Sequence, residues 1–276
     1  MLKRIISRLD LKNGVLVKGI SLEGLRNLGD PNYFSKKYYD DLIDEIHFQD
    51  IVASLYDRDA ITKIIEKNSK NIFVNVCVGG GIRSLKDVDK LLRIGADKIA
   101  INSSGVRDPN FLKELVKIYG SSTISVNIET IKISSFYEVM IETGREKTGV
   151  NLFKWIDKLQ KIGVGELIIT KINDEGKQNG FDVNFYKSLR KEIDIPLVAH
   201  GGAGSKENIL ELFEEANVDG VSIASIFHYK YMKQDKNSNA YGTNYFLKNF
   251  NEKKSLGILI KDLKKYLATN GIKIRI

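Results

Sequence analysis

The chain has 276 residues, enough for one large domain or two ordinary ones, and its content of 42% hydrophobic and 28% charged residues excludes a disordered chain. It contains no apolar run long enough for a membrane span, no beginning typical of a secretory signal, and a single cysteine, Cys77; we therefore expect a cytoplasmic protein without disulfide, metal or cofactor. The net charge of +8 lies in residues 228–276, where eleven Lys/Arg face three acids without a basic-aromatic motif, which indicates a solvated face rather than a nucleic-acid site.

Short apolar runs alternate with helix-period segments along the whole chain. The predicted strands are Ile5–Leu9, Glu45–Asp50, Ile72–Val76, Lys98–Ile101, Thr123–Ile128, Glu166–Thr170, Ile195–Ala199 and Gly220–Ile223. The predicted helices include Ser84–Ile94, Pro109–Tyr119, Leu152–Ile162, Lys206–Glu215 and Leu256–Ala268. Eight strands, each followed by a helix, favour a single-domain (β/α)8 TIM barrel over residues 1–276. An open doubly wound sheet is the alternative, because counting strands does not reveal closure.

The chain repeats itself at an offset of about 121 residues, which indicates two similar half-barrels. Residues 79–104 align with the segment that begins at His200, and the same offset places Glu45 on Glu166. An offset of 119 places Asp10 on Glu129, each near the C-terminal end of its strand.

Two stretches interrupt the alternation. Residues 130–148 predict a small hairpin over the end of the fifth strand, and residues 230–255, rich in Lys, Asn and Tyr, indicate an insertion before the last helix.

Glycine-rich turns follow two of the predicted strands, at Gly79–Gly81 and Gly201–Gly204. Small polar residues follow one strand later, at Asn102–Ser104 and at Ala224 and Ser225. Glycine allows the backbone to approach an anion closely, although it also serves simply to turn the chain. Because the run is duplicated with matching partners, we predict two phosphate cradles on opposite sides of one barrel.

Acidic residues end three strands, and active sites of barrels lie at that end. Asp10 and Glu129 fall on opposite sides of the barrel mouth, as general acid–base chemistry requires, and Asp50 is a third candidate. Lys12 and Lys18 follow Asp10 in a predicted loop. Each acid taken alone could equally cap the next loop.

Four charged residues of both signs, Arg4, Glu45, Lys98 and Glu166, stand at strand starts on the opposite face. Such residues are ordinarily solvated; if they point inward instead, they form a ring of ion pairs across the barrel floor.

These segments resemble the cyclase subunit of imidazole glycerol phosphate synthase over nearly the full length of the chain. The similar segments, in family order, are RIISRLDLKNG, VKG, LEGLRNLGDP, FQDIVAS, VGGGI, GADKIAIN, GREKTG, GGAG and SIFH. The resemblance implies a (β/α)8 barrel that partners a HisH-like glutaminase at its N-terminal face. Ammonia from the glutaminase would pass through the barrel and react with PRFAR, a bis-phosphorylated ribulosyl carboxamide, giving imidazole glycerol phosphate and an aminoimidazole carboxamide ribotide (AICAR) for histidine biosynthesis.

The resemblance also assigns roles to individual residues. Asp10 is similar to one catalytic aspartate, Glu129 stands in place of the second, and Asp97 is similar to an acid near the glutaminase interface. The ring of Arg4, Glu45, Lys98 and Glu166 corresponds to an ammonia gate. The expected substrate and phosphate contacts are Lys18, Asp50, Gly80, Gly81, Asn102, Ser103, Thr170, Gly176, Gly201, Gly202, Ala224 and Ser225.

Departures from the family pattern surround the substrate. Glu129 is one methylene longer than aspartate, the D-x-D-G-T-x-x-G loop reads NDEGKQNG at 173–180, and His200 replaces a small serine. These changes leave two alternatives to the cyclase: a paralogue that uses channelled ammonia to amidate a sugar nucleotide for surface glycans, and a non-catalytic barrel that only binds a glutaminase.

Overall fold

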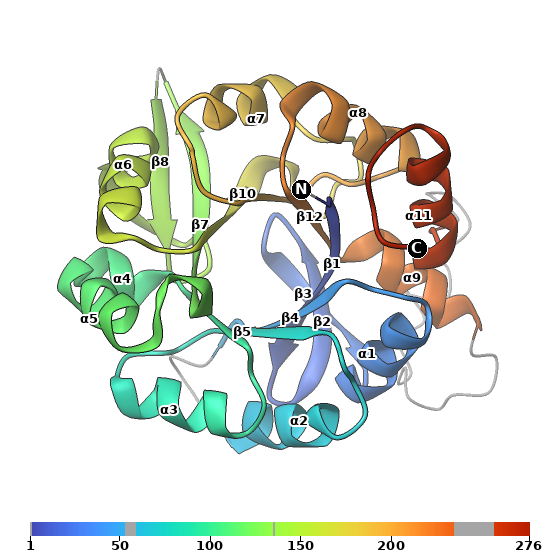
Figure 1. The fold of residues 1–276 in the computed structure, drawn as a ribbon, viewed down its shortest axis with the longest axis horizontal. Coiled ribbons are helices and arrows are strands. Elements are labelled where there is room, and N and C mark those ends of the chain that lie inside the picture. Colours follow the sequence, from blue (N-terminus) through green and yellow to red (C-terminus); the bar gives the residue numbers. More distant parts are fainter. Residues whose placement is uncertain (1, 53–58, 135, 235–256) are drawn as a thin grey trace.

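A computed structural model describes residues 2–52, 59–134, 136–234 and 257–276, which form a closed barrel of eight parallel strands surrounded by helices (Figure 1). The barrel strands, in chain order, are β1 (Arg4–Lys12), β4 (Glu45–Asp50), β5 (Asn75–Gly79), β6 (Lys98–Ile101), β7 (Ile124–Ile133), β10 (Glu166–Lys171), β11 (Leu197–His200) and β12 (Gly220–Ile223). The last strand pairs with the first in parallel, from Arg4 opposite Gly220 to Ser7 opposite Ile223. The predicted TIM barrel is confirmed, and the open-sheet alternative is wrong.

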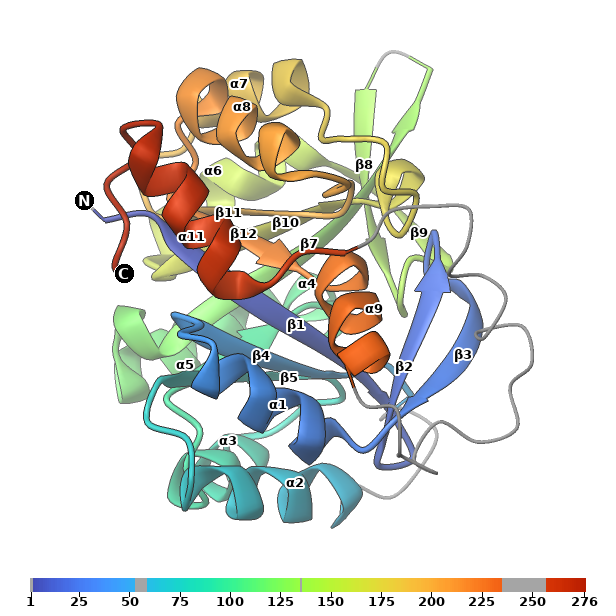
Figure 2. The ribbon, with the colours of Figure 1, turned by 90° about the vertical axis from the view of Figure 1, so that its right-hand side faces the viewer.

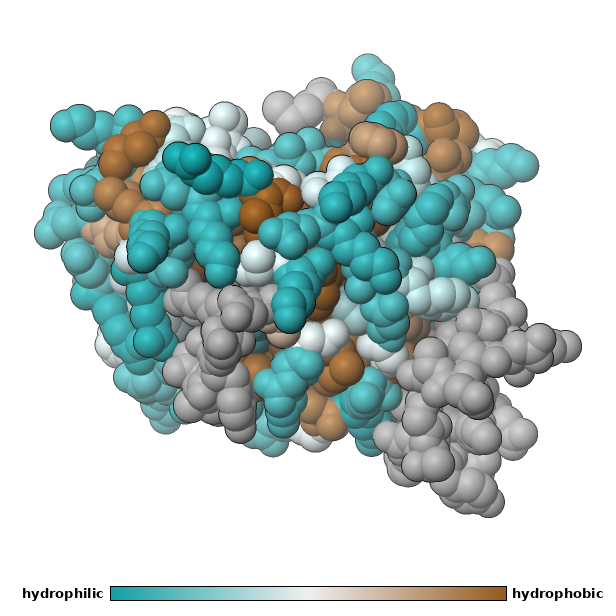
Figure 3. Space-filling view, turned by 90° about the horizontal axis from the view of Figure 1, so that it is seen from below, coloured by the Kyte–Doolittle hydropathy of each residue, from teal (hydrophilic) through white to brown (hydrophobic). Residues whose placement is uncertain are grey.

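The helices place their apolar sides on the barrel and their polar sides in water. They are α1 (Pro31–Asp40), α2 (Asp59–Ser69), α3 (Leu85–Arg93), α4 (Ser103–Arg107), α5 (Pro109–Tyr119), α6 (Leu152–Ile162), α7 (Val183–Arg190), α8 (Lys206–Ala216), α9 (Ser225–Gln234) and α11 (Ile260–Thr269). Figure 3 looks onto the side of the molecule formed by α2 and α3 and shows a mostly hydrophilic surface. Among the described residues, no helix has the length and apolar character needed to cross a membrane.

Two antiparallel hairpins rise at one end of the barrel, and both chain termini lie at the other end (Figure 2). The predicted hairpin at 130–148 is present: β7 runs on into it and pairs with β8 (Phe136–Ile141), which pairs with β9 (Glu146–Asn151). The segment after Asp10, expected to be a loop, is a second hairpin of β2 (Val15–Ile20) and β3 (Glu23–Gly29). In this segment apolar and polar residues alternate around glycines. That pattern occurs in loops as well as in hairpins, so the sequence did not distinguish the two.

The predicted strand Ile72–Val76 begins three residues too early, since β5 starts at Asn75. The Ile72 amide donates a hydrogen bond to the Asn68 carbonyl at the end of α2, and Phe73 is 75% exposed. Ile72 and Phe73 therefore belong to the connection between α2 and β5. Residues 230–234 of the expected insertion continue helix α9, and residues 235–255 lie outside the described residues.

The internal repeat appears as duplicated local structure. Capping boxes begin α3 at Ser84 and α8 at Ser205, one repeat length apart. Asp97 accepts a hydrogen bond from the Val76 amide at 2.8 Å, and Asp219 accepts one from the Leu197 amide at 2.9 Å. Each half therefore uses the same hydrogen bonds, a capping box at the start of a helix and an aspartate that holds the start of a strand.

The last helix is held to the barrel by Asp41, which is 9% exposed. Its carboxylate accepts hydrogen bonds from the Ile260 amide at 2.8 Å, from the Lys261 amide at 3.3 Å and from the Tyr231 hydroxyl. Because Tyr231 belongs to α9, this carboxylate joins α9 to α11. Helix α9 begins at Ser225, one of the predicted phosphate contacts.

We expect Asp41→Ala to lower the free energy of unfolding by about 1–3 kcal/mol, because it leaves these buried donors without an acceptor. The measurement is urea unfolding followed by circular dichroism. Asp40→Ala is the matched control: Asp40 forms a half-exposed pair with Lys36, and its loss should cost less than about 0.5 kcal/mol. Equal losses in the two variants would contradict the anchoring role of Asp41.

Candidate functional site

The carboxyls of Asp10 and Glu129 lie inside the mouth of the barrel, 4% and 5% exposed. Asp10 precedes the β1–β2 turn, and Glu129 lies on β7 just before that strand leaves the barrel. Asp10 accepts a hydrogen bond from Arg8 Nε at 2.8 Å and lies 4.0 Å from Lys18 Nζ. Glu129 accepts a hydrogen bond from the side-chain amide of Asn102 at 3.2 Å.

The two acids have opposite pKa shifts. Burial alone would raise the pKa of Asp10, but the charges of Arg8 and Lys18 outweigh it and hold this pKa below its ordinary value. Burial raises the pKa of Glu129 to about 7; the charge of Arg8 opposes this rise and the charge of Asp10 adds to it. The pair therefore offers one ionised carboxylate and one carboxyl that titrates near neutrality, which is the arrangement that general acid–base chemistry uses.

Lys18 lies on β2 beside Asp10 and forms an ion pair with Glu175, both side chains being almost completely buried. Glu175 also accepts a hydrogen bond from the Leu22 amide at 3.1 Å, and its carbonyl accepts one from Ser21. The β2–β3 hairpin is thereby attached to the loop after β10, close to the acid pair.

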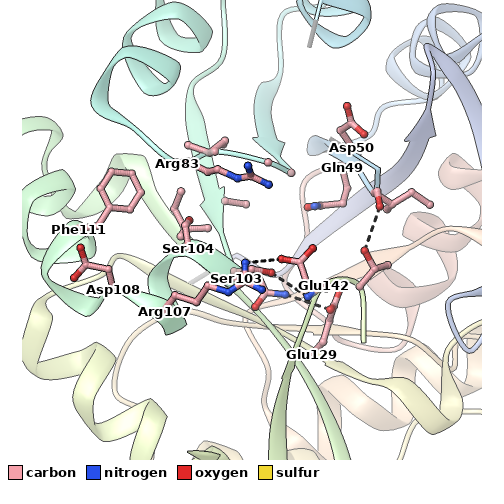
Figure 4. A pocket seen from close by; sticks show the side chains of 18 residues that line it. Gln49, Asp50, Arg83, Ser103, Ser104, Arg107, Asp108, Phe111, Glu129 and Glu142 are labelled. Atoms are coloured by element: carbon pink, nitrogen blue, oxygen red, sulfur yellow. Dashed lines mark hydrogen bonds and ion pairs between the residues drawn. The ribbon is translucent and has the colours of Figure 1, made fainter. Parts of the chain in front are cut away.

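The first glycine cradle lines a cavity of about 320 Å³ on the β5–β6 side of the mouth, together with Glu129. Five of the predicted contacts line it: Asp50, Gly80, Gly81, Asn102 and Ser103. Figure 4 shows Arg83 and Gln49 pointing into this space from opposite sides. Backbone amides, hydroxyls and an arginine around one cavity are suited to an anion such as phosphate.

The second cradle lies across the barrel, on the β11–β12 side. Gly201 and Gly202 both have positive φ, and a Cβ on Gly202 would lie 2.3 Å from the Gly180 carbonyl oxygen. A Cβ on Gly176 would lie 2.7 Å from the Gly19 carbonyl oxygen. Packing of the loops thus requires glycine at 176 and 202 whether or not an anion binds.

The remaining predicted contacts surround this cradle. Thr170 on β10 is in register with Glu129 on one side and His200 on the other, and Ala224 and Ser225 follow the end of β12. The structure therefore brings both predicted sets to the same end of the barrel.

The four charged residues at strand starts point inward and form a ring on the opposite floor. Arg4 lies 2.9 Å from Glu45 and also pairs with Glu166, while Lys98 lies 2.9 Å from Glu45 and 3.2 Å from Glu166. Burial disfavours the charged form of Lys98, but the charges of Glu45 and Glu166 outweigh this effect and raise the pKa of Lys98. Asp97 lies on the same face next to this ring.

The sequence reasoning missed several residues of the site, of which Arg8 is the most important. Arg8 lies two positions before Asp10 on one strand, so period-2 alternation would have placed both on the same face. Arg83 stands two residues after Gly81, and its closeness to the first glycine run could have identified it. Glu175 carried no such signal, because its pairing with Lys18 joins distant loops. Among the described residues, no cluster of three His, Cys, Asp or Glu side chains could hold a metal ion.

Comparisons with known proteins agree with this architecture. Residues 4–233 match the family described as "Histidine biosynthesis protein". Similar curated proteins named "Imidazole glycerol phosphate synthase subunit HisF" include that of Natranaerobius thermophilus, 34% identical over 99% of both chains. Those of Dehalococcoides mccartyi and Bacillus cereus are 38% and 39% identical over 82% of this chain and 90% of theirs. The chain belongs to the HisF family. The resemblance inferred from the motifs is confirmed.

In this HisF homologue, acid should destabilise the fold through its buried histidines. Burial lowers the pKa of His200 and of His228 to about 3, below the value of about 6.5 expected in the unfolded chain. Between these values the unfolded state binds more protons, so each histidine should remove up to about 1.4 kcal/mol of stability per pH unit as pH falls. Glu129 has the opposite effect on stability. Because its pKa is raised to about 7 in the folded state, its protonation stabilises the fold as pH falls below about 7.

The measurement is urea unfolding at several acidic pH values for the wild type and His228→Phe. The phenylalanine retains the packing against Tyr38 but binds no proton, so the stability of the variant should fall less steeply with acid. Parallel slopes for the two proteins would refute a neutral, buried His228.

Proposed function

We propose that this protein is the cyclase subunit of imidazole glycerol phosphate synthase. It would combine PRFAR with ammonia and release imidazole glycerol phosphate, AICAR and water, in the cytoplasm as the composition predicts. The observation that carries the proposal is the placement of Asp10 and Glu129 inside the mouth, with Glu129 lining the cavity of the first glycine cradle. The names of the matched relatives support the same activity.

The cradles suit the two phosphates of PRFAR. In the closed sheet, β5 and β6 are separated from β11 and β12 by two strands on either side, so the acid pair lies between the two cradles. A substrate held at both ends would place its reacting centre near Asp10 and Glu129, and such positioning supplies much of the rate enhancement in enzymes.

Ammonia would come from a HisH-like glutaminase docked on the N-terminal face. The ionic ring of Arg4, Glu45, Lys98 and Glu166 lies on that face and at the start of the barrel axis, where a gate is needed. Three exposed apolar side chains precede strand starts there: Leu2, Leu42 and Phe73, 56%, 49% and 75% exposed. Their exposure supports a protein partner at this face.

The other two functions considered receive less support. The relatives named HisF favour the histidine pathway over amidation of a glycan sugar. The opposite pKa shifts of Asp10 and Glu129 favour an enzyme over a barrel that only binds a glutaminase.

The direct test is turnover of PRFAR by the isolated subunit with an ammonium salt, followed by chromatography of the two products. We expect turnover by the wild type and a loss of about 100-fold or more in Asp10→Asn, because the amide cannot accept a proton. The change is nearly isosteric but removes the charge beside Arg8, so circular dichroism of the variant serves to show that it is folded. Wild-type protein that binds PRFAR without converting it would overturn the proposal.

The ring is tested by the ratio of glutamine-dependent to ammonium-dependent turnover in the complex with a HisH glutaminase. Lys98→Met removes one of the two cations and leaves Glu45 and Glu166 to share Arg4, which should disturb the floor. Ammonium reaches the mouth directly, so we expect the ratio to change several-fold while ammonium-dependent turnover changes little. Lys86→Met, on the exposed side of α3, is the control. A proportional change in both rates would mean that the ring only supports the fold.

A further inference from the structure

Arg8 is a buried arginine in the interior of the barrel, and none of the roles proposed above uses it. It is 1% exposed and stands two residues before Asp10 on β1, so both side chains share the inward face. Its Nε donates to Asp10 Oδ1 at 2.8 Å, while Nη1 has no hydrogen-bond partner in the part of the chain that the structure describes. A guanidinium this deeply buried requires a carboxylate close by.

The charges around the mouth do not balance if every acid is ionised. Two buried cations, Arg8 and Lys18, face three buried carboxyls, Asp10, Glu129 and Glu175. Lys18 pairs with Glu175 and lies 4.0 Å from Asp10, and Arg8 bonds to Asp10. These contacts use both cations on two acids, and among the described residues Glu129 forms no ion pair.

The surroundings of the two acids agree with this count. The groups that face Asp10 are Arg8 on its own strand, Lys18 on β2, the acid Glu129, and three histidines, His47 on β4, His200 on β11 and His228 on α9. Glu129 faces Arg8, Asp10, the Asn102 amide and the Gly144 backbone. Burial lowers the pKa of His200 and of His228 to about 3 and that of His47 well below its ordinary value, so the three histidines are neutral and add no third cation.

We propose that Arg8 is the positioning residue of the acid pair: it holds Asp10 in a fixed orientation as the carboxylate, and so leaves Glu129 as the carboxyl that carries the proton. On the proposed function, Asp10 then accepts a proton and Glu129 donates one, and Arg8 decides which acid has which role. Arg8 acts through Asp10 and needs no contact with the substrate.

The test follows the two carboxyls directly in the substrate-free protein, by NMR titration of protein labelled with ¹³C at Asp and Glu carboxyls. Asp10→Asn and Glu129→Gln assign the two signals. In the wild type, Glu129 should titrate with a midpoint near 7, and Asp10 should stay ionised through the acidic range in which the protein is folded. An Asp10 signal that titrates near neutrality, beside a permanently ionised Glu129, would overturn the proposal without any Arg8 variant.

The Arg8 variants then test the cause. Arg8→Met keeps the length and apolar stem of the side chain but removes its charge, so the Asp10 midpoint should rise by about one pH unit or more. Arg8→Lys should restore most of the wild-type midpoint, and Arg93→Met, on the exposed end of α3, should leave it unchanged. An Asp10 midpoint that Arg8→Met does not move would refute the role of Arg8.

Activity distinguishes this proposal from the proposed function. If the protein turns over PRFAR, Arg8→Met should shift the pH profile of turnover at constant free ammonia, while a purely structural role would lower the rate at every pH alike. Titrations as expected in a protein that does not convert PRFAR would refute the cyclase function and leave the division of the proton between Asp10 and Glu129 intact.

Discussion

The interior of the barrel sets the constraint on which the rest of the structure depends: a charge that points inward must be matched by a charge of opposite sign. Alternation along the strands places Arg4, Arg8 and Asp10 on one inward face of β1, so the strand carries charge at both ends of the barrel. At the floor, two cations meet two acids and the charges balance. At the mouth, two cations meet three acids, and burial raises the pKa of Glu129, the acid without an ion pair among the described residues, to about 7. The same physical rule thus gives a floor whose charges are paired and a mouth with one acid outside the ion pairs.

The mouth is shaped by loops that are attached to one another rather than by the barrel alone. Glu175 joins the β2–β3 hairpin to the loop after β10 through Lys18 and the Leu22 amide. The β8–β9 hairpin is attached by Ser103, which accepts a hydrogen bond from the Glu142 backbone amide at 3.0 Å. Because both hairpins are held by side chains next to the acid pair, a change in a loop alters the surroundings of Asp10 and Glu129 directly. The departures at 173–180 and at His200 lie in these surroundings, while the floor ring keeps its four charges.

The two half-barrels have kept their scaffold more closely than their chemistry. The capping boxes at Ser84 and Ser205 and the strand-start acids Asp97 and Asp219 make equivalent hydrogen bonds in each half. The acids at the strand ends, in contrast, have diverged in length and in surroundings, since Asp10 has Arg8 beside it and Glu129 has an uncharged amide. A duplicated barrel thereby presents two carboxyls with different proton affinities from nearly equivalent positions.

The sequence by itself determined the alternation of strands and helices, its repeat, the two glycine runs, the acids at strand ends and the four charges at strand starts, because strand periodicity and motif order are local properties of the chain. It did not determine that these four charges point inward, since strand starts are ordinarily solvated and only closure of the sheet turns them toward one another. Nor did it reveal the β2–β3 hairpin or the pairing of Lys18 with Glu175, 157 residues apart. The protonation of Glu129 likewise depends on the tertiary structure, because a pKa is set by burial and by the charges that the fold brings close.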